Sequence, residues 1–259
     1  MSPDTVHPTP QPSSSAGKPR VALVTGGSRG IGRAVVEQLA HDGLAVVVGY
    51  TGNEQAADEA VAAVRERGGT AVAARFDVAD EVAVAAAFER AEREFGGIDV
   101  VVHAAGRMAL APIAELDLNV LDELHRTNIR GTFVVDQQAA RRVRAGGAIV
   151  NFSTSVLALA FPTYAAYTAS KGAVEAVTLI LARELRGRDV TVNAVAPGPT
   201  ATALFLDGKD EATIDRLAKQ PPLERLGTPA DIAEVVAFLA SPAGHWVNGQ
   251  VLRANGGIA

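Results

Sequence analysis

Val21-Ala22-Leu23-Val24-Thr25-Gly26-Gly27-Ser28-Arg29-Gly30-Ile31-Gly32 is the stretch of this 259-residue chain that decides its fold. An apolar run leads directly into a turn whose glycines have the spacing Gly-x-x-x-Gly-x-Gly, and a helical pattern follows. Glycine allows positive φ and close approach of the backbone, while the first turn of a helix offers free N–H groups and the positive end of the helix dipole. This order predicts a cradle for a nucleotide phosphate; the alternative is an ordinary turn between a strand and a helix.

Apolar, β-rich runs alternate with helical patterns along the rest of the chain. We expect strands at 21–25, 45–49, 70–76, 100–103, 148–153, 191–195 and 250–253, and helices at 30–42, 54–67, 81–95, 117–144, 164–187 and 228–240. Nearly continuous hydrophobic strands indicate a parallel sheet covered on both faces, and right-handed crossovers make it doubly wound. The prediction is an α/β chain with a single Rossmann-type domain over residues 18–259, in which ligands bind beyond the carboxyl ends of the strands.

Composition and charge exclude several classes of protein. Hydrophobic residues make up 48% of the chain, and at a net charge of −5 the lysines and arginines are scattered among acids, so nucleic acid is not an expected partner. No apolar run is long enough to span a bilayer and no signal peptide is recognisable, which favours the cytoplasm. With no cysteine and five dispersed histidines, we expect neither disulfides nor a metal site. Residues 1–17 are polar and proline-rich, which predicts a disordered arm.

A second motif, Tyr167-Thr168-Ala169-Ser170-Lys171, lies in the helix expected at 164–187. Residues four apart lie on the same face of a helix, one turn from each other. A lysine ammonium next to a phenol stabilises phenolate and lowers its pKa from about 10, so the tyrosine becomes usable for proton transfer to a carbonyl oxygen or from an alcohol. The alternative is a solvated helix face on which the two side chains have no joint role.

Taken together, these motifs resemble those of the short-chain dehydrogenase/reductase family from about Lys18 onward, and in particular its 3-oxoacyl-thioester (acyl carrier protein) reductase type. The family's motifs match residues 25–32, Asp77-Val78, Asn128, Tyr167 with Lys171, and Pro197-Gly198, while its Asn-Asn-Ala-Gly is altered to His103-Ala104-Ala105-Gly106. The resemblance implies an enzyme that reduces the carbonyl group of a small molecule, with a hydride from a nicotinamide cofactor and a proton from Tyr167. It also implies a homo-oligomer, either a dimer or a tetramer.

The catalytic residues that the resemblance implies are Asn128, Thr154, Tyr167 and Lys171. Thr154 stands where the family has a serine, thirteen residues before the tyrosine, and its hydroxyl offers the same donor and acceptor, with Ser155 as the alternative. Asn128 is expected to position a water molecule near Lys171, or else to be a buried asparagine bonded to its own helix. Lys171 is expected to lower the pKa of Tyr167 and to hold the nicotinamide ribose.

Charge favours NADP(H) over NAD(H) as the cofactor. Enzymes that use NAD(H) usually carry an acid at the end of the second strand, where it holds the ribose hydroxyls and repels a 2′-phosphate. In this chain no acid follows that strand before Glu54. Arg29 is expected to bind the 2′-phosphate, with Thr51 and Asn53 as further hydrogen-bonding groups and Tyr50 along the adenosine. The alternative for Arg29 is a surface arginine without a ligand.

The remaining cofactor contacts follow from the resemblance. Asp77 is expected to accept a hydrogen bond from the adenine amino group with Val78 against the ring, and the alternative for Asp77 is a cap on the following turn. His103 is expected to bond a neighbouring carbonyl, with a titrating group near the site as the alternative, and Thr202 is expected to donate to the nicotinamide carboxamide. The full set of expected cofactor-binding residues is Gly26, Ser28, Arg29, Gly30, Ile31, Gly32, Tyr50, Thr51, Asn53, Asp77, Val78, Ala104, Ala105, Gly106, Tyr167, Lys171, Pro197, Gly198, Thr200 and Thr202.

The expected substrate side is apolar, which suggests a ketone with hydrocarbon character. Its candidates are Met108, Leu110, Leu157, Phe161, Tyr164 and Leu204, and residues 203–222 are expected to form a mobile lid. Three other functions fit part of the pattern: a non-catalytic NADP-binding regulator, an NAD-linked alcohol or sugar dehydrogenase, and a sugar-nucleotide epimerase or dehydratase. Retention of both Tyr167 and Lys171 argues against the regulator, and the epimerase branch generally has a longer C-terminal substrate domain.

Overall fold

A seven-stranded parallel sheet forms the centre of the computed structural model, which describes residues 19–259. Its order is β3-β2-β1-β4-β5-β6-β7. The strands are β1 (Val21–Thr25), β2 (Ala45–Tyr50), β3 (Thr70–Arg75), β4 (Ile98–His103), β5 (Val143–Phe152), β6 (Val190–Pro197) and β7 (Val251–Ala254). The predicted doubly wound α/β fold is confirmed. The arm predicted at 1–17 lies outside the described residues.

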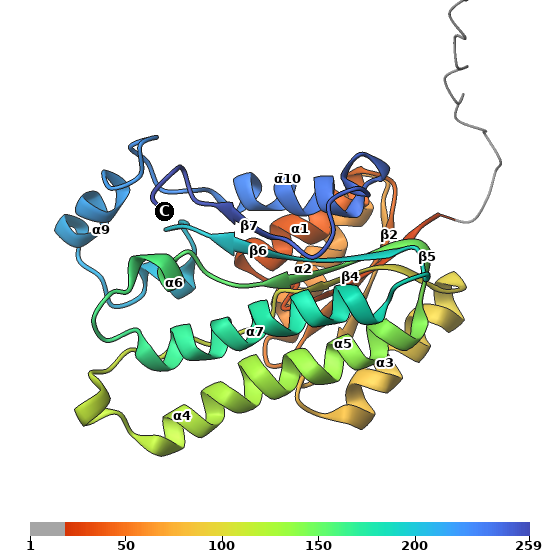
Figure 1. Cartoon of the computed structure of the whole chain (residues 1–259). Helices are drawn as coiled ribbons and strands as arrows, with labels where there is room; N and C mark the ends of the chain where they lie inside the picture. Colours follow the sequence, from red (N-terminus) through yellow and green to blue (C-terminus); the bar gives the residue numbers. More distant parts are fainter. Residues whose placement is uncertain (1–18) are drawn as a thin grey trace, which may run out of the picture.

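Helices cover both faces of the sheet (Figure 1). One face carries α1 (Gly30–His41), α2 (Glu54–Glu66) and α10 (Pro229–Ala240), and the other α3 (Glu81–Phe95), α5 (Gly131–Arg142) and α7 (Ala165–Glu184). The shorter elements are η1 (Ile113–Glu115), α4 (Leu118–His125), η2 (Arg126–Arg130), α6 (Val156–Leu159), α8 (Ala203–Leu206), α9 (Glu211–Ala218) and η3 (Pro242–Gly244). No helix within residues 19–259 is long and apolar enough to cross a bilayer.

Successive residues of a strand pack into two separate hydrophobic cores, one on each face of the sheet. In β1, Val21 and Leu23 pack under α3, α5 and α7, whereas Ala22 and Val24 pack under α1, α2 and α10. All four are completely buried. Full burial of a valine or leucine side chain contributes about 1.5–3 kcal/mol, so a strand that is apolar on both sides is stable only between two helical layers.

The long helix predicted at 117–144 is interrupted, and the following strand begins earlier than expected. Between α4 and α5, η2 is a π-helical turn, which accommodates one additional residue in the helix. The carbonyl of Asn128 in this turn accepts a hydrogen bond from the Thr132 hydroxyl at 2.7 Å. β5 begins at Val143 rather than 148, where its pairing with β4 shifts register between Ile98 and Val100.

The carboxyl ends of the central strands converge where the strand order reverses between β1 and β4. β1 ends at Thr25 and β4 at His103, and the two residues are partners in the parallel pair. β5 ends at Phe152, which is paired with Val195 of β6. The glycine turn, residues 103–106, Thr154 and Pro197-Gly198 lie at these ends, and Tyr167 and Lys171 lie on α7 beside them, which is where doubly wound sheets bind ligands. Asp77-Val78 follow β3, and Asn128 lies in η2.

Candidate active site

A cavity of about 790 Å³ opens at the carboxyl ends of the strands. Its walls come from the glycine turn, the loops after β2, β3, β4, β5 and β6, the first turns of α7, and the segment that contains α8 and α9. All of the predicted cofactor-binding residues line it, as do Thr154, Tyr167 and Lys171. Of the predicted catalytic residues, Asn128 alone lies behind the wall.

The glycine turn leaves room for a ligand because its backbone packs against other backbone. Gly26 has φ +66°, and a Cβ there would lie 3.0 Å from Cα of Ala105. A Cβ on Gly32 would lie 2.1 Å from the carbonyl oxygen of Gly26, which no side chain tolerates. The N-terminus of α1 therefore faces the cavity without an obstructing side chain, as a phosphate cradle requires.

Tyr167 and Lys171 lie on the same side of α7. Nζ of Lys171 is 5.9 Å from the centre of the Tyr167 ring and donates a hydrogen bond of 2.7 Å to the carbonyl of Phe152. Burial lowers the pKa of Lys171 to about 8 and raises the pKa of Tyr167 to about 12, and Thr154 acts on the tyrosine in the opposite direction. The prediction that Lys171 brings the tyrosine pKa down is therefore wrong in this structure, because desolvation of the phenol outweighs the hydrogen bond with Thr154.

Thr154 stands between two serines whose hydroxyl groups are engaged elsewhere. Ser153 donates to Glu175 at 2.6 Å. Ser155 donates to the carbonyl of Ala196 at 2.9 Å, which uses its only proton. Thr154 accepts a hydrogen bond from the Val156 N–H at 3.3 Å, lines the cavity, and lies within hydrogen-bonding reach of the Tyr167 phenol, whose pKa it lowers.

Asn128 forms hydrogen bonds to the backbone of Arg107, in the segment that follows β4 and lines the cavity. It is 1% exposed and lies in the π turn η2. Its Oδ1 accepts from the Arg107 N–H and its Nδ2 donates to the Arg107 carbonyl and to Oγ of Ser170, each at 2.9 Å. The alternative that this side chain bonds its own helix is wrong, because its partners follow β4 or belong to α7. A Cβ on Gly106 would lie 3.4 Å from both Asn128 Oδ1 and Lys171 Nζ, so Asn128 adjoins two residues of the cavity wall.

Comparison with known proteins decides the family. A family model described as Enoyl-(Acyl carrier protein) reductase matches residues 26–259. A short-chain type dehydrogenase/reductase of Picea abies is 44% identical over 248 residues, which cover 92% of each chain. The NADPH-dependent aldehyde reductase 2 of Arabidopsis thaliana is 38% identical over 92% of this chain and 93% of its own. A short-chain dehydrogenase of Burkholderia cenocepacia, solved in complex with NADP, is 36% identical and superposes with a TM-score of 0.87 over 92% of this chain and 97% of its own.

The chain belongs to the short-chain dehydrogenase/reductase family. It is therefore an oxidoreductase, as its sequence predicts. The likeness to the 3-oxoacyl-thioester type within this family stays a prediction.

His103 is the clearest departure from the family pattern. Its Nδ1 lies 2.9 Å from the Thr25 hydroxyl, so the expectation of a carbonyl partner is wrong. Thr25 also accepts from the Ala105 N–H at 3.1 Å and thereby joins β1 to the segment after β4. Nε2 of His103 is buried without a partner within residues 19–259. Burial, with a smaller effect of the Lys171 charge, lowers the pKa of His103 to about 3, so the ring is neutral.

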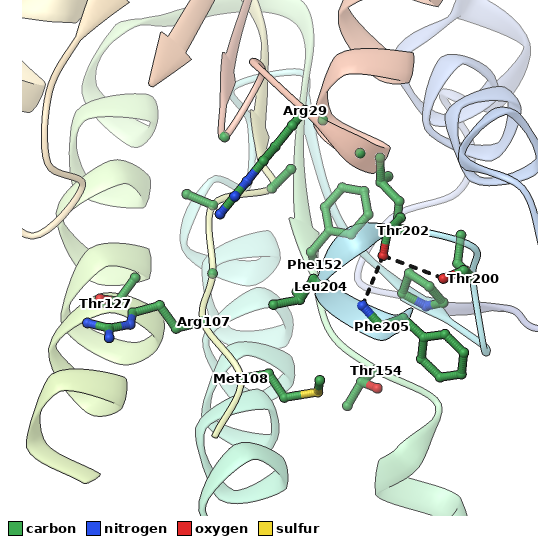
Figure 2. A pocket seen from close by; sticks show the side chains of 18 of the residues that line it. Arg29, Arg107, Met108, Thr127, Phe152, Thr154, Thr200, Thr202, Leu204 and Phe205 are labelled. Atoms are coloured by element: carbon green, nitrogen blue, oxygen red, sulfur yellow. Dashed lines mark hydrogen bonds between the residues drawn. The ribbon is translucent and has the colours of Figure 1, made fainter. Parts of the chain in front are cut away.

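The part of the cavity where adenosine is expected carries a positive side chain, that of Arg29. Arg29 extends from the glycine turn into the cavity (Figure 2), and it has no acidic partner within residues 19–259. Thr51 and Asn53 are less available than expected. The Thr51 hydroxyl donates to the Phe76 carbonyl at 3.0 Å, and Asn53 Oδ1 caps α2 by accepting from Ala56 N–H.

Asp77 caps the turn that follows it, as the alternative for this residue proposed. Its Oδ1 accepts from the Ala79 N–H at 2.9 Å and its Oδ2 pairs with Arg126 at 2.6 Å. Burial works against the carboxylate, but these hydrogen bonds and the arginine charge hold the pKa of Asp77 below its usual value. Asp77 also lines the cavity, so the cap and an adenine contact are compatible.

The substrate side differs from the prediction at two positions. Met108, Phe161, Tyr164 and Leu204 line the cavity, but Leu110 and Leu157 do not. Leu110 is 40% exposed, and Leu157 points to α7, where a Cβ on Gly172 would contact it at 3.7 Å. Lining residues that we did not predict include Arg107, Arg126, Thr127, Phe152, Ser153, Val156, Leu159, Ala203, Phe205 and Leu217. Phe205 lies within one helical turn of Thr202, whose hydroxyl caps α8, so a capping search would have found it (Figure 2).

Gly32→Ala should abolish binding of a nicotinamide cofactor, because the new methyl group would overlap the Gly26 carbonyl and force the turn to open. Titration of NADPH by fluorescence measures the loss, and thermal unfolding shows whether the fold survives. Gly172→Ala is the matched control, since its methyl group meets only ordinary contacts inside a helix, where alanine is favoured by about 0.5–1 kcal/mol. Equal binding by both variants would contradict the role of this turn.

Proposed function

We propose that this protein is an NADP(H)-dependent reductase that converts the carbonyl group of an apolar small molecule to an alcohol, with Tyr167 as the proton donor. The observation that carries the proposal is the meeting of Tyr167, Lys171 and the Thr154 hydroxyl in one cavity with the glycine turn. The cradle fits a dinucleotide, because a backbone without side chains faces the cavity at Gly26 and Gly32. A nicotinamide cofactor, when bound there, supplies the hydride.

The protein groups supply the proton and the electrostatic stabilisation. Thr154 donates a hydrogen bond to the substrate carbonyl oxygen, where negative charge develops during reduction. Tyr167 then transfers its phenolic proton to this oxygen. Lys171, held by the Phe152 carbonyl, keeps a positive charge close to the phenolate that results. At a pKa of about 12 the tyrosine carries its proton throughout the neutral range, which supports reduction as the working direction.

The preference for NADP(H) rests on Arg29. Its guanidinium reaches into the cavity and has no acidic partner within residues 19–259, whereas Arg107 pairs with Glu123 and Arg126 with Asp77. A charge-assisted hydrogen bond to a 2′-phosphate contributes about 1.5–3 kcal/mol. Two relatives support a preference for NADP(H). The Arabidopsis relative is named an NADPH-dependent reductase, and the Burkholderia relative was solved in complex with NADP.

The substrate side favours a flat or aromatic carbonyl compound. Phe161 and Tyr164 meet edge to face, with ring centres 5.9 Å apart and planes at 65°. Phe205, Leu159 and Met108 complete an apolar lining. Aromatic side chains offer large contact areas and favour edge or offset contacts with other rings. An aryl ketone or aryl aldehyde should therefore bind better than a sugar, which would leave its hydroxyl groups without partners here.

A homo-oligomer remains part of the proposal. Three large apolar side chains on α5 and α7, Phe133, Leu179 and Ile180, are exposed by 56%, 42% and 55%. Neighbouring exposed apolar residues on helices are typical of surfaces that a second copy covers.

Tyr167→Phe should lower turnover of a ketone or aldehyde by about 10²- to 10⁴-fold, because the general acid is lost while the ring stays. Tyr164→Phe is the matched control and should retain turnover. The assay follows NADPH oxidation with a panel that contains aryl ketones, aliphatic ketones and sugars. Unchanged turnover in Tyr167→Phe would overturn the proposed mechanism, and preference for a sugar with NADH would favour the alternative dehydrogenase function.

Arg29→Ala should weaken NADPH binding by about 10- to 100-fold and leave NADH binding nearly unchanged, because only the 2′-phosphate contact is lost. Arg33→Ala is the control, since Arg33 pairs with Glu37 outside the cavity. Dissociation constants of NADPH and NADH, measured by their fluorescence for both variants, test this prediction. An equal loss for both cofactors would mean that Arg29 supports the turn itself rather than the phosphate.

The pH dependence of reduction should follow Lys171 rather than Tyr167. Below its pKa of about 8 Lys171 is charged, and as pH rises through this value the charge that stabilises phenolate is lost, while Tyr167 keeps its proton up to about 12. We expect kcat/KM for reduction to be level at lower pH and to fall above about 8. In Lys171→Arg, whose guanidinium stays charged, the remaining activity should lack this inflection. An inflection that persists in the variant would assign it to another group.

A further inference from the structure

The loop that carries Thr154 is anchored on both sides. On one side the Ser153 hydroxyl donates to Glu175 of α7, and on the other the Ser155 hydroxyl donates to the Ala196 carbonyl of β6. The backbone N–H of Ser155 also donates to the Pro197 carbonyl at 3.0 Å. The position of the Thr154 hydroxyl therefore depends on bonds that its neighbours make to Glu175 and Ala196, neither of which lines the cavity.

Asn255 is a further anchor of this loop and comes from a distant part of the chain. Its Nδ2 donates to Oγ of Ser155 at 3.0 Å, across 100 residues of sequence, and also to the Ala259 carbonyl at 3.0 Å. Its Oδ1 accepts from the Gly257 N–H at 2.9 Å. With these bonds Asn255 supports its own turn and at the same time orients the serine next to Thr154.

The turn after Asn255 packs against the end of the segment that covers the cavity. Gly256 and Gly257 have φ +65° and +89°, and a Cβ on each would lie 3.0 Å from Pro221 and 3.1 Å from Pro222. The Leu223 N–H donates to the Gly256 carbonyl at 3.3 Å. These contacts are at the end of residues 203–222, the expected lid. Leu204, Phe205 and Leu217 within this segment line the cavity.

A continuous set of contacts thus runs from Thr154 through Ser155 and Asn255 to Pro221. The hydrogen bond from Ser153 to Glu175 connects the loop to α7 and not to segment 203–222. We propose that Asn255 is a positioning residue, which ties the orientation of the Thr154 loop to the position of segment 203–222. The proposal rests on the proposed function in one respect only, namely that the Thr154 hydroxyl contacts the substrate carbonyl. In this arrangement, closure of the segment over a substrate and alignment of Thr154 occur together.

Kinetics of Asn255→Ala, Ser155→Ala and the double variant test the link. Asn255→Ala should lower kcat about 10-fold with little change in the dissociation constant of NADPH, because misplacement of a catalytic group reduces the rate rather than cofactor binding. The effects should be strongly non-additive if Asn255 acts through Ser155, with the double variant close to the worse single variant. Additive losses, or an unchanged kcat in Asn255→Ala, would overturn the proposal. Asn119→Ala, in an exposed turn of α4, is the matched control.

Comparison of Asn255→Asp with Ser155→Ala separates the link from support of the local turn. Aspartate still accepts from the Gly257 N–H but loses both bonds that Nδ2 donates, to Ser155 and to the Ala259 carbonyl, whereas Ser155→Ala leaves the turn's own bonds in place. The proposed role predicts a similar loss of kcat in both variants, and a turn-only role predicts wild-type kinetics in Ser155→Ala. Asn255→Asp also keeps the test decisive if Asn255→Ala does not fold.

Amide hydrogen exchange supplies a readout that needs no substrate. In Asn255→Asp, peptides that contain residues 153–158 and 211–223 should both exchange faster than in wild type and in Asn119→Ala, with the global unfolding midpoint nearly unchanged. Faster exchange in neither peptide, or in one alone, would refute the link even if no substrate turned over. Absence of carbonyl turnover in wild type, by contrast, would refute the proposed function.

Discussion

The close approach of two backbone segments is the constraint on which the rest of this site depends. The glycine turn after β1 and the segment after β4 touch at Gly26 and Ala105, at the point where the strand order reverses. Thr25 adds a side-chain hydrogen bond between them. Because no side chain occupies this contact, the N-terminus of α1 is open to the cavity and the ends of β4, β5 and β6 come within reach of one ligand.

Burial then decides which groups around this contact carry charge. Desolvation raises the pKa of Tyr167 to about 12 and lowers that of His103 to about 3, so both side chains are neutral throughout the neutral range. Lys171 keeps its proton in the neutral range in spite of burial, held by the carbonyl of Phe152. A positive charge with neutral neighbours acts strongly on a nearby developing negative charge, because little solvent screens it.

Much of this site could be predicted from the sequence, because its motifs are local. The glycine turn is one continuous stretch, Tyr167 and Lys171 are one helical turn apart, and Thr154 follows a strand end. The failures concern properties that arise only on folding. The raised pKa of Tyr167 reflects burial, which spacing does not reveal. Leu110 was misplaced because it lies in an irregular segment, where no periodicity tells the direction of a side chain.

The hydrogen bonds of Asn128 could not be predicted from the sequence either, because its bonds to Arg107 and Ser170 depend on the π turn in which it lies.

That π turn has a consequence for protein engineering. Each residue of an α-helix advances the chain by about 100°, so deletion of one residue from η2 to restore a regular helix would rotate α4 relative to α5 by that angle. Either Asn128 would leave the interior or Arg126 would swing away from Asp77, so this helix cannot be shortened by a single codon without disturbing one side of the cavity.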